Sequence, residues 1–86
     1  MKWRRQPHVA WQMVADQAVL MNLASGQTIG LNPSASFIWA RIVERTDAEI
    51  ARELAERFRL EPSRAEAEVR EFLDFLARNT FVAGEA

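Results

Sequence analysis

A strand passes directly into a helix in the stretch Thr28-Ile29-Gly30-Leu31-Asn32-Pro33-Ser34-Ala35-Ser36-Phe37-Ile38-Trp39. Asn32 is a favoured N-cap residue, because its side-chain oxygen can accept a hydrogen bond from an unpaired amide of the first helical turn. Pro33 suits the first helical position, since its missing N–H would have no partner there and its fixed φ fits a helix. The stretch therefore predicts a sheet that ends, and a helical half that begins, at Asn32.

Two further strands precede this stretch. Residues 9–14 alternate with period two, as a half-buried strand should, and a turn at Asp16–Gln17 leads to an apolar run over 18–23. Gly26 can adopt the positive φ that a tight hairpin requires before the third strand, 27–31. The sequence thus predicts a three-stranded antiparallel meander in chain order, with its third strand at an edge.

Three helices follow the strands. They are expected over residues 33–43, from a capping box at 46–49 to residue 58, and over 62–78. Asn79 is predicted as a left-handed residue just after the third helix. The fold class is therefore predicted as α+β: an N-terminal three-stranded antiparallel β-meander followed by three helices, in a winged-helix-like arrangement.

The ends of the chain are expected to lie outside a single domain that covers residues 9–82. Residues 1–8 show no periodicity and are expected to form an arm, with Trp3 holding the arm against the domain. Residues 83–86 are expected to form a frayed tail.

The composition of the chain argues against several classes of function. A chain of 86 residues has room for one small core and not for an enclosed active-site cavity. No apolar run approaches the ~20 residues that span a bilayer, so we expect no membrane contact and take the cytoplasm as the default location. A net charge of −1 argues against a general binder of polyanions.

Residues that could carry catalysis are few. His8 is the only histidine, and its place beside Pro7 predicts a solvated side chain. The glutamates of the helices stand beside arginines, which is typical of a charged face and not of a tuned acid–base pair. The sequence has no cysteine and no Gly-rich phosphate loop. We therefore expect no enzyme, no metal site and no cofactor.

Nucleic-acid binding is the structural competitor, since small winged-helix folds often read DNA with one helix. The third helix does offer arginines, but acidic residues are interleaved with them and would repel a phosphate backbone. The arginines are Arg64, Arg70 and Arg78, and the acidic residues are Glu61, Glu66, Glu68, Glu71 and Asp74. We expect no nucleic-acid partner.

Peptide binding requires only an open sheet edge beside an apolar groove. Residues 27–31 form the expected edge, and Gly30 has no side chain to obstruct an approaching strand; a bulge or close backbone packing at Gly30 is the structural alternative. Phe75 lies on the flank of the third helix, about 100° from Leu76. It is either a wall of the groove or a core-edge residue covered by the N-terminal arm.

Several motifs occur in an order that resembles the PqqD-like family, whose members are peptide-binding modules also called RiPP recognition elements. The resemblance covers residues from about Val9 to Val82. The matching pieces are the strand 19–23, the turn Ser25-Gly26, Leu31-Asn32-Pro33-Ser34-Ala35 leading to Ile38-Trp39, Thr46 to Leu54 in the pattern T-x-x-E-I-A-x-x-L, and Val69 to Leu76 in the pattern V-x-x-F-L-x-x-L.

The resemblance implies a non-catalytic module that binds the leader of a ribosomally made precursor peptide as an added strand. The module would present this peptide to a modifying enzyme such as a radical-SAM protein. Carried onto this sequence, the implied peptide-binding residues are Gln27, Thr28, Ile29, Gly30, Leu31, Arg64, Glu68, Glu71, Phe72 and Phe75. Three alternatives stay open: a regulatory domain that docks onto a protein through the third helix, a winged-helix DNA-binding protein, and a homodimer formed through the open edge.

Overall fold

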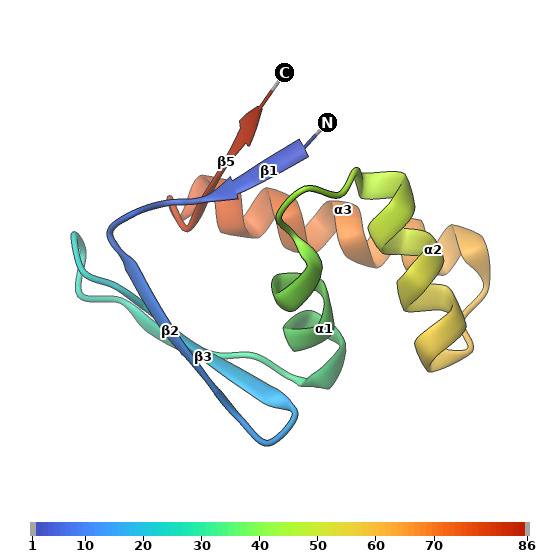
Figure 1. The fold of residues 1–86 in the computed structure, drawn as a ribbon, viewed down its shortest axis with the longest axis horizontal. Helices are drawn as coiled ribbons and strands as arrows, with labels where there is room; N and C mark the ends of the chain where they lie inside the picture. Colours follow the sequence, from blue (N-terminus) through green and yellow to red (C-terminus); the bar gives the residue numbers. More distant parts are fainter. Residues whose placement is uncertain (1, 86) are drawn as a thin grey trace.

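The computed structural model describes residues 2–85, and its central sheet follows the predicted order. Strands β2 (Val9–Val14), β3 (Gln17–Asn22) and β4 (Thr28–Gly30) form an antiparallel sheet in the order β2-β3-β4 (Figure 1). The first turn occupies residues 15–16, one residue earlier than predicted, because Ala15 adopts the positive φ of 55°. Gly26 has φ 81° in the second turn, as predicted. The predicted α+β fold class with a three-stranded meander is confirmed.

The three helices also lie where the sequence predicts them: α1 (Pro33–Arg41), α2 (Asp47–Phe58) and α3 (Pro62–Arg78). Asn32 caps α1 by accepting a hydrogen bond from the Ala35 amide at 2.9 Å. Thr46 and Glu49 form the predicted capping box at the start of α2. Within residues 2–85, no helix combines the length and the apolar character that crossing a membrane requires.

The left-handed residue after α3 is Thr80, with φ 58°, so the prediction for Asn79 is wrong. Asn79 has φ −97°, and its side-chain amide donates to the carbonyl of Phe75 at 2.9 Å. This bond satisfies a terminal carbonyl of the helix without a change of backbone hand, and the reversal of the chain moves one residue further.

Both ends of the described residues are strands, which corrects the predicted arm and tail. Strand β1 (Lys2–Arg5) pairs antiparallel with β5 (Val82–Glu85) in a separate two-stranded sheet. The pairing satisfies the backbone groups of both segments, so residues 2–5 and 82–85 belong to the folded unit. Ala86, the last residue of the predicted tail, lies outside the described residues.

Side chains near the two ends explain this pairing. Trp3 is half-buried against the core, and its Nε1 donates a hydrogen bond to the carboxylate of Asp47. Phe81 and Val82 are almost fully buried, which holds the start of β5 against the helices. His8 is partly exposed, and its Nε2 donates to the carbonyl of Thr80 at 2.9 Å.

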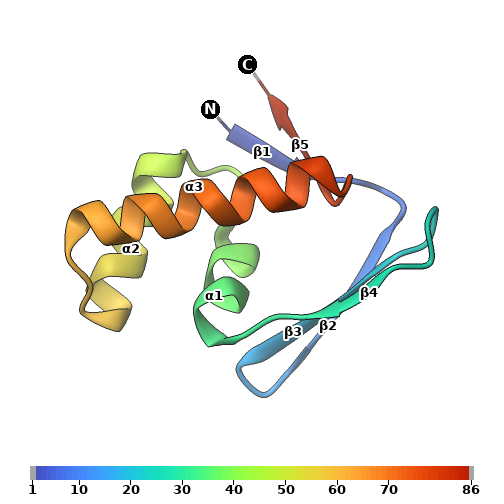
Figure 2. The ribbon, with the colours of Figure 1, turned by 180° about the vertical axis from the view of Figure 1, so that it is seen from behind.

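A single core fills the space between one face of the central sheet and the helices. The three helices lie on the same side of this sheet, whose strands β2, β3 and β4 run along the opposite side of the molecule (Figures 1 and 2). Ala18, Leu20 and Asn22 point inward from β3 and are fully buried, whereas Val19 and Met21 point outward and are exposed. This alternation is that of an antiparallel sheet with one covered face.

Candidate functional site

Strand β4 forms an open edge of the central sheet. The carbonyl of Gln27 accepts from the Asn22 amide at 2.8 Å, and the Leu31 amide donates to the carbonyl of Ala18 at 2.8 Å. In an antiparallel ladder such residues alternate with residues whose backbone groups point the other way. Thr28 and Gly30 therefore direct their N–H and C=O groups away from β3. Among the strands of residues 2–85, β4 pairs with β3 alone, so these four groups form a free edge.

The surroundings of Gly30 rule out the structural alternative for this glycine. A Cβ atom at Gly30 would meet nothing within 4 Å, and its register opposite Val19 is regular. Neither close backbone packing nor a bulge therefore requires glycine here. The open space at Gly30 lies on the outer face of the sheet, to which the side chain of its partner Val19 also points.

Two buried polar side chains connect β3 and the residue that follows β4 to the helical half of the molecule. Ser36 of α1 accepts from the Ala18 amide at 2.8 Å and donates to the Leu31 carbonyl at 3.3 Å. At the other end, the Asn22 side-chain amide donates to the carbonyl of Asn79 and to the hydroxyl of Thr80, at 3.1 and 3.0 Å. Buried polar groups with every bond made hold one geometry, so the edge is rigid with respect to α1 and α3.

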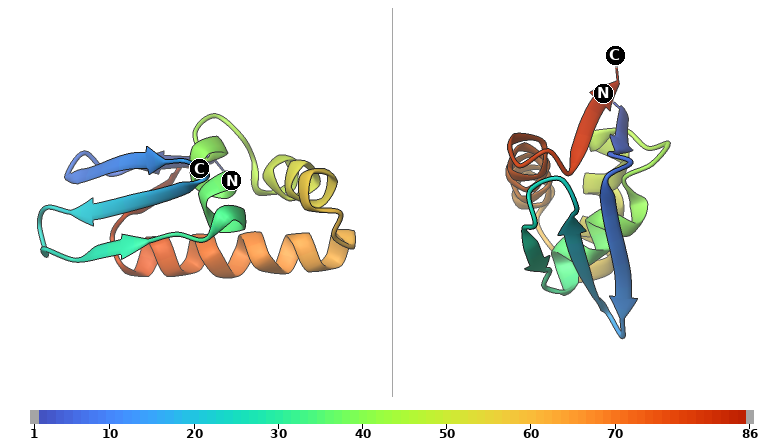
Figure 3. Two further views of the ribbon diagram at one scale, coloured as in Figure 1. Left: turned by 90° about the horizontal axis from the view of Figure 1, so that it is seen from below. Right: turned by 90° about the vertical axis from the view of Figure 1, so that its left-hand side faces the viewer.

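A hollow of about 300 Å³ opens beside this edge, starting at Asn32, two residues after β4. The elements that enclose it are the start of α1 and the middle of α3, and among the strands of the central sheet β4 is the one on the side of α3 (Figure 3). Its apolar side consists of Ala35, Ile38 and Phe72. The polar lining residues are Asn32, Ser34, Glu68 and Glu71.

The predicted site residues divide into four groups. Glu68, Glu71 and Phe72 line the hollow, together with four residues that the sequence analysis did not assign to the site: Asn32, Ser34, Ala35 and Ile38. Gln27, Thr28, Ile29 and Gly30 belong to or adjoin the open edge, with Thr28 and Gly30 exposed. Leu31 is only 7% exposed, so its side chain belongs to the core.

Two predicted residues lie outside the hollow. Phe75 is half-buried against the core and is not among the residues that line it. Arg64 is exposed, and its Nε lies 3.5 Å from Oε1 of Glu68 one helical turn away. An exposed pair of this kind adds little stability, so Arg64 at most orients the Glu68 carboxylate toward the hollow.

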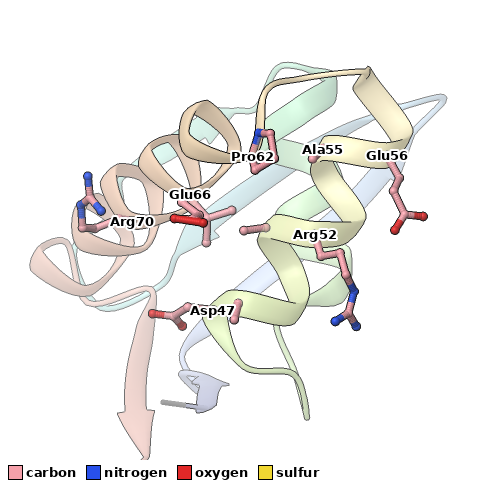
Figure 4. A pocket seen from close by; sticks show the side chains of 10 residues that line it. Asp47, Arg52, Ala55, Glu56, Pro62, Glu66 and Arg70 are labelled. Atoms are coloured by element: carbon pink, nitrogen blue, oxygen red, sulfur yellow. The ribbon is translucent and has the colours of Figure 1, made fainter.

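A larger hollow, of about 590 Å³, lies elsewhere, between α2 and α3 (Figure 4). Its apolar floor is built by alanines of α2 and by Val69, and charged residues of both signs form its rim. All its lining residues belong to α2 or α3, so no strand edge lines it. Within residues 2–85, no three His, Cys, Asp or Glu side chains are grouped so that they could hold a metal ion.

Known proteins of similar structure have been solved with bound peptides. The chain superimposes with a TM-score of 0.88 on TbiB1 in complex with the TbiA(beta) leader peptide, at 28% sequence identity, covering 100% of this chain and 99% of that chain. A lasso peptide synthetase B1 complexed with its leader peptide gives a TM-score of 0.87 at 22% identity, covering 98% and 100%. At that lower identity, the second likeness concerns the fold alone.

A comparison with known protein families shows to which family the chain belongs. No functionally curated protein sequence matches the chain. The family described as coenzyme PQQ synthesis protein D (PqqD) matches residues 17–82, which include β3, β4, all three helices and the hollow beside β4. This match covers well over half of the chain, so the protein belongs to the PqqD family.

Proposed function

We propose that this protein is a non-catalytic recognition module that binds the leader segment of a ribosomally made precursor peptide. The leader adds as a strand along β4, between that edge and α3. The observation that carries the proposal is the free edge at Thr28 and Gly30, which lies beside the hollow at Phe72. An unpaired edge supplies main-chain hydrogen bonds, and an adjacent hollow supplies selectivity for side chains.

The β4 edge and the hollow contribute differently to peptide binding. The outward groups of Thr28 and Gly30 provide up to four hydrogen bonds to any extended peptide, whatever its sequence. Side chains of an added strand alternate between the two faces of the sheet. Those on the helical side would reach the hollow, where Ala35, Ile38 and Phe72 favour an apolar group and Glu68 and Glu71 favour a positive charge. Specificity therefore arises at the hollow.

The likeness to TbiB1 supports this proposal, since that protein was solved with a leader peptide and the match spans the whole of this chain. The partner that receives the bound peptide is, in our proposal, the enzyme that modifies the precursor, such as a radical-SAM protein or another maturase. The protein itself takes no part in the chemistry. Its role is to hold the leader so that the rest of the precursor reaches that enzyme.

A titration followed by backbone amide chemical shifts tests the proposal. The isotope-labelled protein is titrated with the leader peptide of a precursor encoded by a neighbouring short reading frame. Shift changes are expected at Gln27–Leu31 and on the Glu68–Phe72 face of α3. Changes confined to the groove between α2 and α3, or no changes at high peptide concentration, would contradict strand addition and favour docking onto another protein.

Two variants at position 30 distinguish the loss of a hydrogen bond at the β4 edge from a loss of the fold. The amide of Gly30 points away from β3, so Gly30→Pro removes a free-edge donor and leaves the β3–β4 ladder intact. Gly30→Ala retains the donor, and open space accommodates its methyl group. We expect both variants to fold, and we expect only the proline variant to lose peptide affinity. Equal affinity of the two variants would contradict hydrogen bonding at this edge.

A further inference from the structure

The central sheet has a second open edge, at β2. The Leu23 amide donates to the carbonyl of His8 at 2.8 Å, so the even-numbered residues of β2 face β3. The odd-numbered residues Val9, Trp11 and Met13 therefore point their backbone groups away from the sheet. The Val9 amide is used locally, since it donates to Gln6 at 3.1 Å. Five backbone groups remain at this edge, and β2 pairs with β3 alone among the strands of the described chain.

The β2 edge lacks the features that usually prevent strands from pairing between molecules. Monomeric proteins protect open edges with lysine, proline, bulges or very short strands. Strand β2 has six residues, with the sequence VAWQMV, and contains neither a charged residue nor a proline. The side chains of Trp11 and Met13 are 42% and 38% exposed on the helical side of this edge. An identical strand can therefore pair with β2 without any contact between like charges.

We propose that β2 pairs antiparallel with β2 of a second copy of this protein, around a two-fold axis at Trp11. In this register Trp11 lies opposite Trp11, Val9 opposite Met13, and Ala10 opposite Gln12. The pairing makes four main-chain hydrogen bonds and overlaps all of residues 8–14. A register centred on Gln12 makes the same number of bonds but overlaps only residues 10–14, so the Trp11 register buries more apolar surface.

Charge complementarity supports a second copy as the occupant. In the Trp11 register, the β2–β3 turn of each copy, which carries Asp16, lies alongside residues 6–8 of the other copy. Arg5 directly precedes those residues, whereas the rest of strand β1 turns away from β2 (Figure 1). The self-paired edge is thus uncharged along its length, and at each of its ends the acidic Asp16 of one copy lies on the side of the basic Arg5 of the other.

The dimer would form a continuous sheet in the order β4-β3-β2-β2-β3-β4. Strands β2 and β4 are at opposite edges of the sheet in each copy, so both β4 edges would stay open (Figure 3). One assembly would then offer two equivalent sites for an added strand. Self-association through β2 does not depend on peptide binding, and the two proposals can fail separately.

Charge variants at the opposed positions 10 and 12 test both the dimer and its register. Ala10 and Gln12 are exposed, so charged side chains fit there without disturbing the core. Ala10→Lys/Gln12→Lys places two pairs of like charges opposite each other, and Ala10→Glu/Gln12→Glu does the same with the opposite sign. Ala10→Lys/Gln12→Glu places opposite charges together in the Trp11 register, whereas a register centred on Gln12 would set the introduced carboxylates of the two copies against each other.

Sedimentation velocity over protein concentrations from about 10 μM to about 1 mM provides the measurement. The unmodified chain of 9.8 kDa is expected to approach twice its mass as concentration rises. Dimerisation of the Lys/Lys and Glu/Glu variants is expected to be weaker by roughly tenfold. The Lys/Glu variant is expected to dimerise as well as the unmodified chain, and circular dichroism confirms that each variant is folded.

Three results would overturn the proposal. The first is a monomer at every concentration, and the second is a dimer that is indifferent to the charges at positions 10 and 12. The third is loss of the dimer in Val19→Lys/Met21→Lys, because these residues point outward from the central strand. That loss would mean that two copies stack face to face and do not pair edge to edge.

Discussion

The two open edges of one small sheet differ in nearly every property that governs what can pair with them. The β4 edge is three residues long, and its outward-facing residues are Thr28 and Gly30. A hollow with two carboxylates lies beside it. The β2 edge is six residues long and uncharged, with Trp11 and Met13 partly exposed beside it. Both strands offer unpaired backbone groups, but the side chains around them differ.

This difference indicates that the backbone groups of an edge strand can bond to any extended peptide, whereas the side chains around the edge select which peptide binds. Four hydrogen bonds at β4 are available to any extended chain, so discrimination must come from the hollow beside α3. At β2 the strand itself is uncharged and matches another copy, and the hollow that contains Asp16, Arg41 and Arg57 reaches this strand only at its end, at Met13. Changes placed at one edge should therefore leave the other edge functional.

The largest effect is expected from Leu76→Ala, which should lower the free energy of unfolding by about 2–5 kcal/mol. Leu76 is fully buried in the core that supports both edges. Phe75→Ala, one residue before it, removes a half-buried side chain and should destabilise the protein less. Chemical denaturation of the two variants measures the difference. Equal destabilisation would mean that Phe75 is a core residue and has no separate role at the β4 edge.

A proline scan of β4 should have the next largest effect. Ile29 lies between Gln27 and Leu31, whose backbone groups bond to β3, so its amide faces the ladder. Ile29→Pro removes that ladder bond and should cost about 3 kcal/mol or more. Gly30→Pro should cost much less, since its amide is free. If the two prolines destabilise the fold equally, the assignment of inward and outward residues along β4 is wrong.

Arg5 connects the β2 edge to the helices, and its replacement should have an intermediate effect. Its Nη2 donates to the carbonyl of Trp39 at 2.6 Å, and its guanidinium lies 4.7 and 5.0 Å from the ring centres of Trp11 and Trp39. Burial lowers the pKa of Arg5 from its ordinary value, and an arginine stays charged at neutral pH all the same. Arg5→Met should cost about 1–3 kcal/mol, measured by denaturation.

Arg5→Lys is the matched control for this change. Lysine retains the charge but lacks the planar group that lies close to two indole rings while donating a hydrogen bond. We expect Arg5→Lys to recover only part of the lost stability. Both variants should leave peptide binding at β4 intact, because Arg5 lies beside the other edge. Loss of peptide binding in a folded Arg5→Met protein would show that the two edges are coupled.

Local chemistry explains why much of this fold was predictable. Period-two alternation, the glycine turn, the Asn32 cap and the Thr46–Glu49 box each act over a few residues, and each predicted an element that the structure contains. The pairing of β1 with β5 joins segments at the two ends of the sequence, each four residues long. Such short strands carry no usable periodicity, so only the tertiary packing of Trp3 and Phe81 reveals them.

The candidate site was predictable to a smaller extent for the same reason. The edge strand follows from alternation, and the three residues of α3 at the hollow follow from the resemblance to the PqqD-like family. The contribution of α1 does not, because Asn32 and Ser34 already have an evident local role at the helix start. Nothing in the sequence indicates that the residues of this cap also face Glu68 and Phe72 across a hollow. That juxtaposition depends on the angle between two helices.

The smallest expected effect is a change in the pH dependence of stability at the start of α2, away from both edges. The backbone amide of Thr46 donates to Oε1 of Glu49 at 2.9 Å, and this bond, helped by the Thr46 hydroxyl, holds the pKa of Glu49 below its ordinary value. A carboxylate with a depressed folded-state pKa contributes stability above its unfolded pKa of about 4.3 and loses that contribution as the pH falls through the folded value.

Glu49→Gln isolates this contribution, because glutamine can still accept the hydrogen bond but does not titrate. Between pH 7 and pH 3.5, the unmodified protein should lose slightly more stability than the glutamine variant, and the other carboxylates affect both proteins alike. Denaturation curves at the two pH values measure the difference. Since α2 supports the core and not a strand edge, peptide affinity and self-association at neutral pH should be the same in both proteins. A selective change at one edge would mean that the helices transmit strain to that strand, and the two edges could then no longer be treated as independent sites.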